Sequence, residues 1–471
     1  MGYTTFPRPS ASPLPLRAPE VTPLPIKPIS ILLLARSGEP IAFTILFPFV
    51  YFMVRDFYLY PDPKQVAIQV GWVASSFSLA QMFSGLPWGA LSDRIGRRPV
   101  ILMGLMGTTL SMLLFGLSHS LVWAISTRIM CGLLNGNVGV VKSALAELTD
   151  ETNQAKGFAF LPMIWGLGSV LGPMIGGFLS NPAQVIGGPF DTAFWRANPY
   201  FLPCATAASV TFAGFLVAFF FLEETMPSKP PSPRIEEGDC SSEGNSEASS
   251  LLPKPISPST PLPSSYIASI LPKASRPAVA CLVGVSFLSV VSDELYPLWA
   301  AARYDVGGLG FDTGRIGMSL SVGGLTILLT QLLLFPRLER RHGKHAIFRI
   351  SMASYFLIWL FLPLVTFLVD TPWMWPCLLL LVALKSWAGT FAFASANLML
   401  VDAARQLGAL GKVNGSAQCL VALGRTIGPA IGGFTWGHCI QSNLPWPLGA
   451  SISWWILAIS SLFVACLSGR S

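Results

Sequence analysis

The chain has 471 residues and a formal net charge of +7; 52% of its residues are hydrophobic and only 11% are charged. A soluble globular chain carries about 25% charged residues, and a chain this apolar would expose large apolar patches to water. The composition therefore excludes an ordinary soluble enzyme and a disordered scaffold. The sequence contains no basic stripe with interleaved aromatic residues, so nucleic-acid binding is not expected.

The predicted elements begin with a tail, residues 1–29, whose eight prolines and lack of a sustained apolar run indicate a mobile segment rather than a signal peptide. A helix needs about 20 apolar residues to cross roughly 30 Å of membrane hydrocarbon. Twelve such windows follow, near 30–54, 66–90, 99–118, 121–146, 157–180, 198–222, 277–302, 315–335, 346–369, 373–401, 412–437 and 446–468.

A polar stretch at 223–276, rich in Pro and Ser, separates the first six windows from the last six. The expected fold is an all-α polytopic membrane protein with twelve transmembrane helices in two pseudo-symmetric six-helix bundles, 30–222 and 277–468, joined by a flexible linker. With the N-terminus inside, inner segments hold twenty of the thirty Lys and Arg residues and outer loops hold five. Cytoplasmic loops carry such an excess, so both termini are expected in the cytoplasm.

A pattern of four glycines and one proline recurs in the fifth and eleventh spans at an offset of 256 residues. Its members are Gly168, Gly172, Pro173, Gly176 and Gly177 in the first half and Gly424, Gly428, Pro429, Gly432 and Gly433 in the second. Small residues four apart let helices approach closely, and proline bends a helix. We interpret the duplicated pattern as a hinge or tight seam between two parallel repeats, although ordinary helix packing would use the same residues.

The loop after the second span reads Gly89-Ala-Leu-Ser-Asp93-Arg94-Ile-Gly96-Arg97-Arg98-Pro99. This run closely resembles the G-x-x-x-D-R-x-G-R-R/K signature of the major facilitator superfamily, and the resemblance covers nearly the whole chain from residue 30. We expect a conformational latch here, formed by Gly89, Asp93, Arg94, Gly96, Arg97 and Arg98.

In this latch Asp93 could face a helix N-terminus, whose dipole favours an anion. Arg97 and Arg98 could pair with inner acids such as Glu147, Asp150 or Glu151. Such contacts would favour one conformation and break in the other.

Further features resemble the twelve-span drug:proton antiporter branch of that superfamily. Arg128 lies in an R-x-x-x-G pattern of proton-coupled members, and Gly415 supplies an additional glycine of the antiporter motif that the fifth span replaces by Ala159. The first span, with Arg36-Ser-Gly-Glu39-Pro40, looks like the zinc-induced-facilitator-like subgroup. The four histidines map to loops or span ends, so zinc itself is not expected as the cargo and no metal site is predicted.

Ionisable side chains inside spans are costly and are therefore functional candidates. Glu39 is the first choice for a proton-coupling acid, because burial favours the protonated form of a carboxyl. Arg36 lies one turn away and favours the charged form, so a static Arg36–Glu39 pair is the alternative. Glu294, next to Asp293 in the seventh span, is the symmetry-related candidate; its alternative is a helix-end acid near the outer surface.

The cations inside spans are candidate charge partners. Arg128 could tune a nearby acid, Lys385 could face a cavity or pair with an acid, and Arg425 could lock against the second span and Asp93. Lys142 could simply extend its amine toward the inner surface. A cavity could be lined by Tyr296, Trp299, Trp387, Phe391 and Asn397, although aromatic residues in spans more often serve packing.

The sequence therefore predicts a secondary transporter that rocks two bundles about a central site and exports a small organic solute while protons flow inward. A symporter or facilitator that imports a nutrient is one alternative, because fold does not set direction; a non-transporting membrane sensor is another. The expected partners are the lipid bilayer, a small-molecule substrate and protons, with no cofactor and a single copy of the chain. The plasma membrane is preferred over the vacuolar membrane.

Overall fold

The computed structural model describes residues 22–57, 62–136, 138–150, 152–226, 272–407, 410–442, 444 and 448–470, which are largely helical and contain no β-strand. Most of the predicted tail and linker lie outside these ranges. The helices are α1 Ile26–Thr44, α2 Val50–Asp56, α3 Pro63–Ile95, α4 Arg97–Gly116, α5 Leu121–Leu134, α6 Val138–Glu147, α7 Gln154–Phe158, α8 Phe160–Phe178, α9 Pro182–Val185, α10 Ala193–Ala197, α11 Phe201–Phe221, α13 Arg276–Ala301, α14 Thr313–Leu329, α15 Phe335–His342, α16 Lys344–Phe361, α17 Met374–Gln406, α18 Leu410–Ile440 and α19 Leu448–Leu467.

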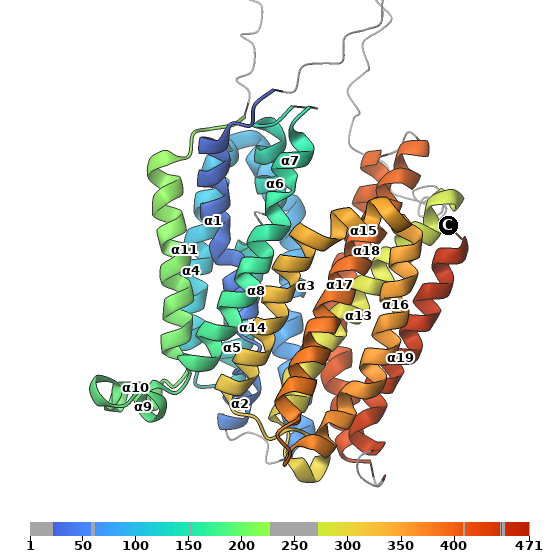
Figure 1. The fold of residues 1–471 in the computed structure, drawn as a ribbon. Coiled ribbons are helices and arrows are strands. Elements are labelled where there is room, and N and C mark those ends of the chain that lie inside the picture. Colours follow the sequence, from blue (N-terminus) through green and yellow to red (C-terminus); the bar gives the residue numbers. More distant parts are fainter. Residues whose placement is uncertain are drawn as a thin grey trace, which may run out of the picture.

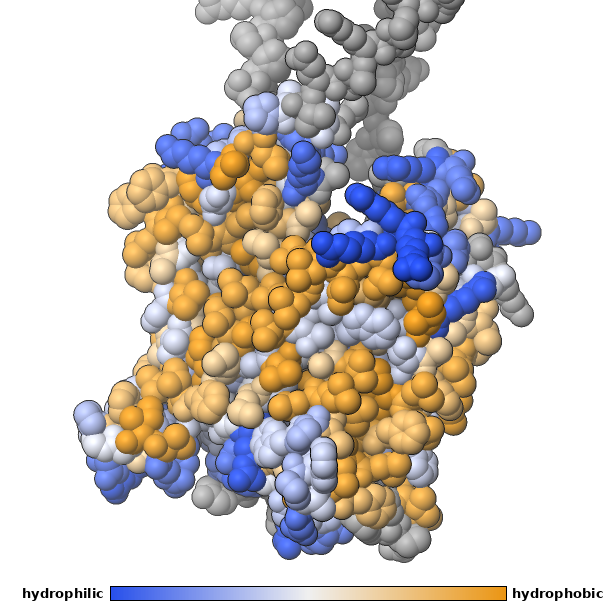
Figure 2. Space-filling view, in the orientation of Figure 1, coloured by the Kyte–Doolittle hydropathy of each residue, from blue (hydrophilic) through white to orange (hydrophobic). Residues whose placement is uncertain are grey.

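Within the described ranges, ten helical stretches are long and apolar enough to cross a membrane. The first and eleventh predicted spans are formed by two further long helices, α1 and α18, and α1 carries Arg36 and Glu39. The helices run side by side between two ends of the molecule (Figure 1), and a broad hydrophobic surface separates hydrophilic ends (Figure 2). The predicted all-α polytopic fold is confirmed.

A glycine with positive φ connects the second span to the third in each half. Gly96 has φ 103° between α3 and α4, and Gly343 has φ 76° between α15 and α16. Residues with a Cβ rarely adopt this backbone conformation. The same turn at corresponding places is a structural sign of the internal repeat.

The two halves meet along two helix crossings, α8 with α14 and α3 with α18. At the first, a Cβ on Gly177 would lie 2.9 Å from the Cα of Gly317. At the second, a Cβ on Gly71 would lie 2.6 Å from the carbonyl oxygen of Pro429, and one on Gly433 would lie 3.3 Å from the Cα of Gly71. Close backbone contact of this kind requires glycine, so part of the repeated pattern lies directly in the seam between the halves.

The other glycines of the pattern face a helix of their own half. Three glycines of α8 pack on the first span: Gly168, Gly172 and Gly176. A Cβ added to any of them would collide with Pro40, Thr44 or Ile45. Those of α18 pack on α13, near Phe287, Val290, Val291 and Glu294: Gly424, Gly428 and Gly432. Each copy of the pattern therefore has one face in the seam and one face inside its own bundle.

The halves are joined more closely at one end of the molecule. Near the start of α3, Lys64 Nζ donates to Gln441 Oε1 at 3.0 Å, and Gln441 Nε2 donates to Asp62 Oδ2 at 2.8 Å. Toward the other end of the same two helices, a Cβ added to Gly89 or Gly415 would meet nothing within 4 Å. The space between the halves is therefore open at the end that carries the Gly89–Arg98 run, and the ribbons of the two groups converge toward the opposite end (Figure 1).

Candidate functional site

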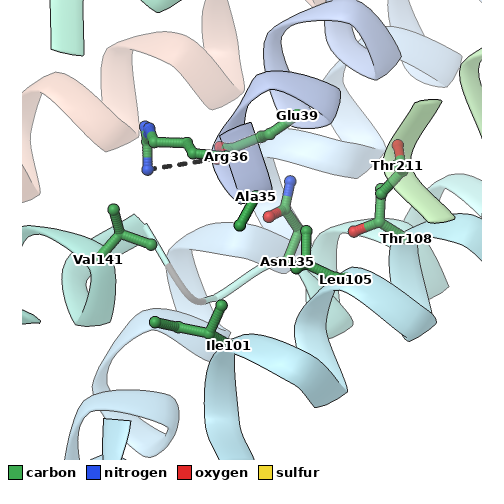
Figure 3. A pocket seen from close by; sticks show the side chains of 9 residues that line it. All are labelled: Ala35, Arg36, Glu39, Ile101, Leu105, Thr108, Asn135, Val141 and Thr211. Carbon is green, nitrogen blue, oxygen red and sulfur yellow. Dashed lines mark ion pairs between the residues drawn. The ribbon is translucent and has the colours of Figure 1, made fainter. Parts of the chain in front are cut away.

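A small pocket in the first half contains the Arg36–Glu39 pair. Its lining residues are Ala35, Arg36, Glu39, Ile101, Leu105, Thr108, Asn135, Val141 and Thr211, and it leaves room for about one water molecule (Figure 3). Arg36 Nη1 lies 3.4 Å from Glu39 Oε2, and the two side chains are only 10% and 12% exposed. The structure thus contains the pair that the sequence left as the alternative to a free coupling acid.

Two more cations belong to this site. Lys142 of α6 interacts electrostatically with Arg36, Glu39 and Arg425, and Arg425 of α18 interacts with Glu39. Both side chains are exposed to solvent, and their interaction with each other across the two halves places them beside the space between the halves. Arg425 therefore brings the second half to the Arg36–Glu39 pair and not to Asp93, because Asp93 lies at the end where the halves have separated.

A second polar group lies on α13. Asp293 Oδ1 accepts a hydrogen bond from Lys385 Nζ at 2.7 Å, so Lys385 pairs with an acid. Glu294 is 1% exposed, and its Oε1 is buried without a hydrogen-bond partner. Its Cβ and Cγ face Gly432 of α18. Since α13 continues to Ala301, Glu294 lies well inside the helix, and the reading of it as a helix-end acid is wrong.

Arg128 is buried in the first half with 2% of its surface exposed. Its guanidinium carbon lies 4.0 Å from the centre of the Phe115 ring, an arrangement that stabilises a cation. Its Nε and Nη2 atoms have no hydrogen-bond partner, and its electrostatic neighbours are the thiols of Cys131 and Cys204. The structure therefore places an aromatic ring and thiols beside Arg128, and no acid pairs with it in the described part of the chain.

The latch residues form a network at the open end. Arg97 Nη1 donates to Asp93 Oδ1 at 2.5 Å and to Ser92 Oγ at 2.6 Å, and Arg97 Nη2 lies 3.0 Å from Glu147 Oε1. Arg98 Nη2 donates to the carbonyl oxygen of Phe219 at 2.6 Å. The expected pairing of Arg97 with Glu147 is present, whereas Arg98 binds backbone and not an acid.

Neither of two other expected latch contacts is formed. Asp93 is 67% exposed, and its carboxylate pairs with the Arg97 side chain; among the described residues, no backbone N–H donates to it. Asp150 accepts hydrogen bonds from Thr22, Thr152 and Asn153, and those from the two threonine side chains lower its pKa to about 2. Glu151 lies outside the described residues, and Arg94 is exposed at the end of α3.

The carboxylate at the N-terminus of α4 belongs to Glu224, a role that sequence reasoning missed. Its oxygens accept from the backbone N–H groups of Arg97 at 2.8 Å and Arg98 at 3.1 Å. Partial burial raises the pKa of Glu224, but hydrogen bonds from the backbone of Arg97, Met226 and Arg98 outweigh burial and hold its pKa below the usual range. An acid directly after an apolar span was visible in the sequence, but the helix it caps lies more than 120 residues earlier.

Glu224→Gln is expected to lower the free energy of unfolding by about 0.5–1 kcal/mol, because an uncharged amide interacts less favourably with the end of α4. Since the folded-state pKa is depressed, the carboxylate stabilises the protein above its unfolded-state pKa, and this contribution is lost as the pH falls through the folded-state pKa. Thermal unfolding in detergent should show a lower Tm at pH 7 and a smaller loss on acidification than wild type. Glu223→Gln, at an exposed neighbouring acid, is the control; equal effects of both substitutions would contradict the capping role.

The predicted cavity residues lie in the second half and do not line the Arg36–Glu39 pocket. Tyr296 and Trp299 are fully buried, and their polar atoms bond within the bundle: Tyr296 Oη to Ser319 Oγ and Trp299 Nε1 to the carbonyl oxygen of Gly307. In this structure both rings are packed into the core, which is the packing role that the sequence left open as the alternative. The rings of Trp387 and Phe391 also pack together, and Asn397 donates to the carbonyl oxygen of Phe393.

Comparison with known proteins agrees with this architecture. The family model described as Major Facilitator Superfamily matches residues 32–431. The chain is 32% identical to the major facilitator superfamily multidrug transporter mfsB of Aspergillus fumigatus, over 94% of this chain and 82% of that protein. It is 32% identical to ZINC INDUCED FACILITATOR-LIKE 1 of Arabidopsis thaliana, over 83% of this chain and 80% of that protein, which confirms the resemblance to that subgroup.

The fold also matches a solved structure. The crystal structure of the human organic anion transporter MFSD10 has a TM-score of 0.60 to this chain, with 18% identity, and the match covers 95% of this chain and 100% of that one. The chain is an integral, multi-pass membrane transporter and not an enzyme. Its helical architecture, its duplicated seam and the match over residues 32–431 together make this chain a member of the major facilitator superfamily.

Proposed function

We propose that the chain exports a small organic solute from the cytoplasm by proton antiport through alternating access. The similarity to mfsB, whose name describes a multidrug transporter, supports a small organic solute as the cargo. The seam supports alternating access, since Gly71 and Gly177 let the halves pivot on closely packed backbones while the other end stands open.

The observation that carries proton coupling is the buried carboxyl of Glu294, whose Oε1 has no hydrogen-bond partner. An isolated carboxylate in apolar surroundings is costly, and protonation removes that cost. Glu39, the first choice from the sequence, is instead paired with Arg36 at 3.4 Å and interacts electrostatically with Lys142 and Arg425. We therefore assign the transported proton to Glu294. Its contact with Gly432 couples it to α18, the helix that carries Arg425.

The open end is assigned to the cytoplasm. The start of α1 and the C-terminus lie at the same end (Figure 1), and the basic residues of the α3–α4 and α15–α16 turns support that side as the inner one. In this arrangement residues 1–29 form a cytoplasmic tail, 223–276 a cytoplasmic linker, and 30–222 and 277–468 the two bundles. The proposed location is the plasma membrane, and one copy of the chain forms the transport unit.

Proteoliposomes loaded with a small-molecule cell extract test this function. With a pH gradient imposed in either direction, mass spectrometry of the retained solutes identifies those that the protein moves. An antiporter moves its solute against the proton flow, so inverting the gradient inverts the direction of solute accumulation. Movement of the solute in the same direction as the protons would identify a symporter. Movement that does not depend on the pH gradient would identify a facilitator.

A further inference from the structure

We propose that the transported solute carries a carboxylate or phosphate group and that Arg36, Lys142 and Arg425 bind it. This inference rests on the proposed transport function and names the substrate class of the same site.

The charges of the site do not balance. Arg36, Lys142 and Arg425 contribute three positive charges, and Glu39 is the acid that interacts with all of them. Arg36 is buried, where a charge is costly unless it is paired and hydrogen-bonded, whereas Lys142 and Arg425 are reached by solvent and so by a solute. An excess of cations within a membrane-spanning bundle therefore favours an anionic ligand.

The geometry leaves a donor ready for that ligand. Arg36 Nη1 is buried without a hydrogen-bond partner, and at 3.4 Å from Glu39 it makes an ion pair but no hydrogen bond. A planar guanidinium can bind both oxygens of a carboxylate or phosphate. Asn135 lies in the same pocket and could add an amide N–H, and the guanidinium and carboxylate of the pair lie above it in Figure 3.

The three cations come from both halves of the protein. Arg36 lies on α1 and Lys142 on α6, whereas Arg425 lies on α18. An anion that enters through the open end meets Lys142 and Arg425 first, because solvent reaches both side chains. Binding between them would reduce the repulsion between Lys142 and Arg425, so the solute itself would promote closure of the cytoplasmic side. An inside-negative membrane potential also drives an anion outward, which agrees with export.

Thiol-labelling rates test the charge selectivity without knowledge of the natural solute. Gly139 lies one helical turn before Lys142, and a Cβ there would meet nothing within 4 Å, so Gly139→Cys places a thiol in the open space. The purified full-length protein is treated with the anionic 2-sulfonatoethyl and the cationic 2-(trimethylammonium)ethyl methanethiosulfonates. Mass spectrometry of the peptide that contains residue 139 separates this thiol from the native cysteines, and rates are normalised to those of 2-mercaptoethanol.

The ratio of the normalised labelling rates, anionic over cationic reagent, is expected to be about ten. Two excess positive charges within about 10 Å of the thiol would produce a ratio of this size in a partly screened space. Adding Lys142→Gln or Arg425→Gln should reduce the ratio to about threefold or less. Arg315→Gln is the matched control, because it removes one positive charge from an exposed site that faces Asp312. Ser143→Cys provides a second reporter if Gly139→Cys impairs folding.

A normalised ratio of one or less, or a ratio insensitive to Lys142 and Arg425, would overturn the proposal. The labelling needs no proton gradient and no transport, so failure of proton coupling leaves its result unchanged. In the extract assay the solutes that the protein moves should carry net negative charge at pH 7. Transport of cations alone would reject the anionic substrate class while leaving the transport function intact.

Discussion

Glu294→Gln is expected to abolish solute accumulation driven by a pH gradient while exchange of solute across the membrane continues. Gln has nearly the same shape as a protonated Glu but cannot release or take up a proton. The bundle around position 294 should therefore stay packed, since Glu294 is already buried without a partner for Oε1. One pH unit supplies about 1.4 kcal/mol per proton and can sustain about a tenfold solute gradient with one proton per solute, so the accumulation ratio should fall from about ten to one.

The measurement uses proteoliposomes and the solutes that the extract assay identifies, with exchange of isotope-labelled solute as the readout that needs no coupling. Glu223→Gln is the control, because Glu223 is an exposed acid outside the bundle. Glu39→Gln tests the other acid in the same assay. If Glu39→Gln removes accumulation and Glu294→Gln does not, the proton is carried by Glu39, and the assignment to Glu294 is wrong.

The sequence predicted the fold and the seam because both depend on periodic patterns. Spans long enough to cross a bilayer follow from composition, and the repeated Gly-Pro pattern identifies helices that approach closely. Gly177 and Gly433 do lie at the crossings between the halves. The pattern could not reveal which glycines contact the other half and which contact their own bundle, as Gly168, Gly172 and Gly176 do.

The sequence could not predict which charges meet, because pairing depends on helix rotation and on contacts far apart in the chain. Glu39 and Glu294 look alike in the sequence as isolated acids in apolar spans. In the structure Glu39 lies near cations, whereas Glu294 packs against Gly432. The sequence predicts that Lys142 extends toward the inner surface, whereas its electrostatic interaction with the Arg36–Glu39 pair involves an element more than 100 residues away. Glu224 reaches the start of α4 over a similar separation.

Gly71→Leu is expected to open the outer end of the seam and reduce transport at least tenfold. A side chain at residue 71 would collide with the carbonyl group of Pro429, which is backbone and cannot rotate away. Overpacking of this kind costs about 1–3 kcal/mol or more, so α3 and α18 must separate. Separation also strains the hydrogen bonds of Gln441 to Lys64 and Asp62 at that end. The halves then cannot return to the cytoplasm-open arrangement, and the transport cycle stops there.

Two measurements separate this blocked cycle from simple misfolding. Spin labels at Ile186 and Trp373, both exposed at the converging end, should report a longer distance in the Gly71→Leu protein than in the unsubstituted one. Gly85→Leu is the matched control on the same helix, because a Cβ at residue 85 would meet nothing within 4 Å. It adds the same side chain to α3, so it should leave both distance and transport near their unsubstituted values. Equal loss in both variants would mean that α3 tolerates no leucine, whereas unchanged transport in Gly71→Leu would show that the halves do not pivot on this crossing.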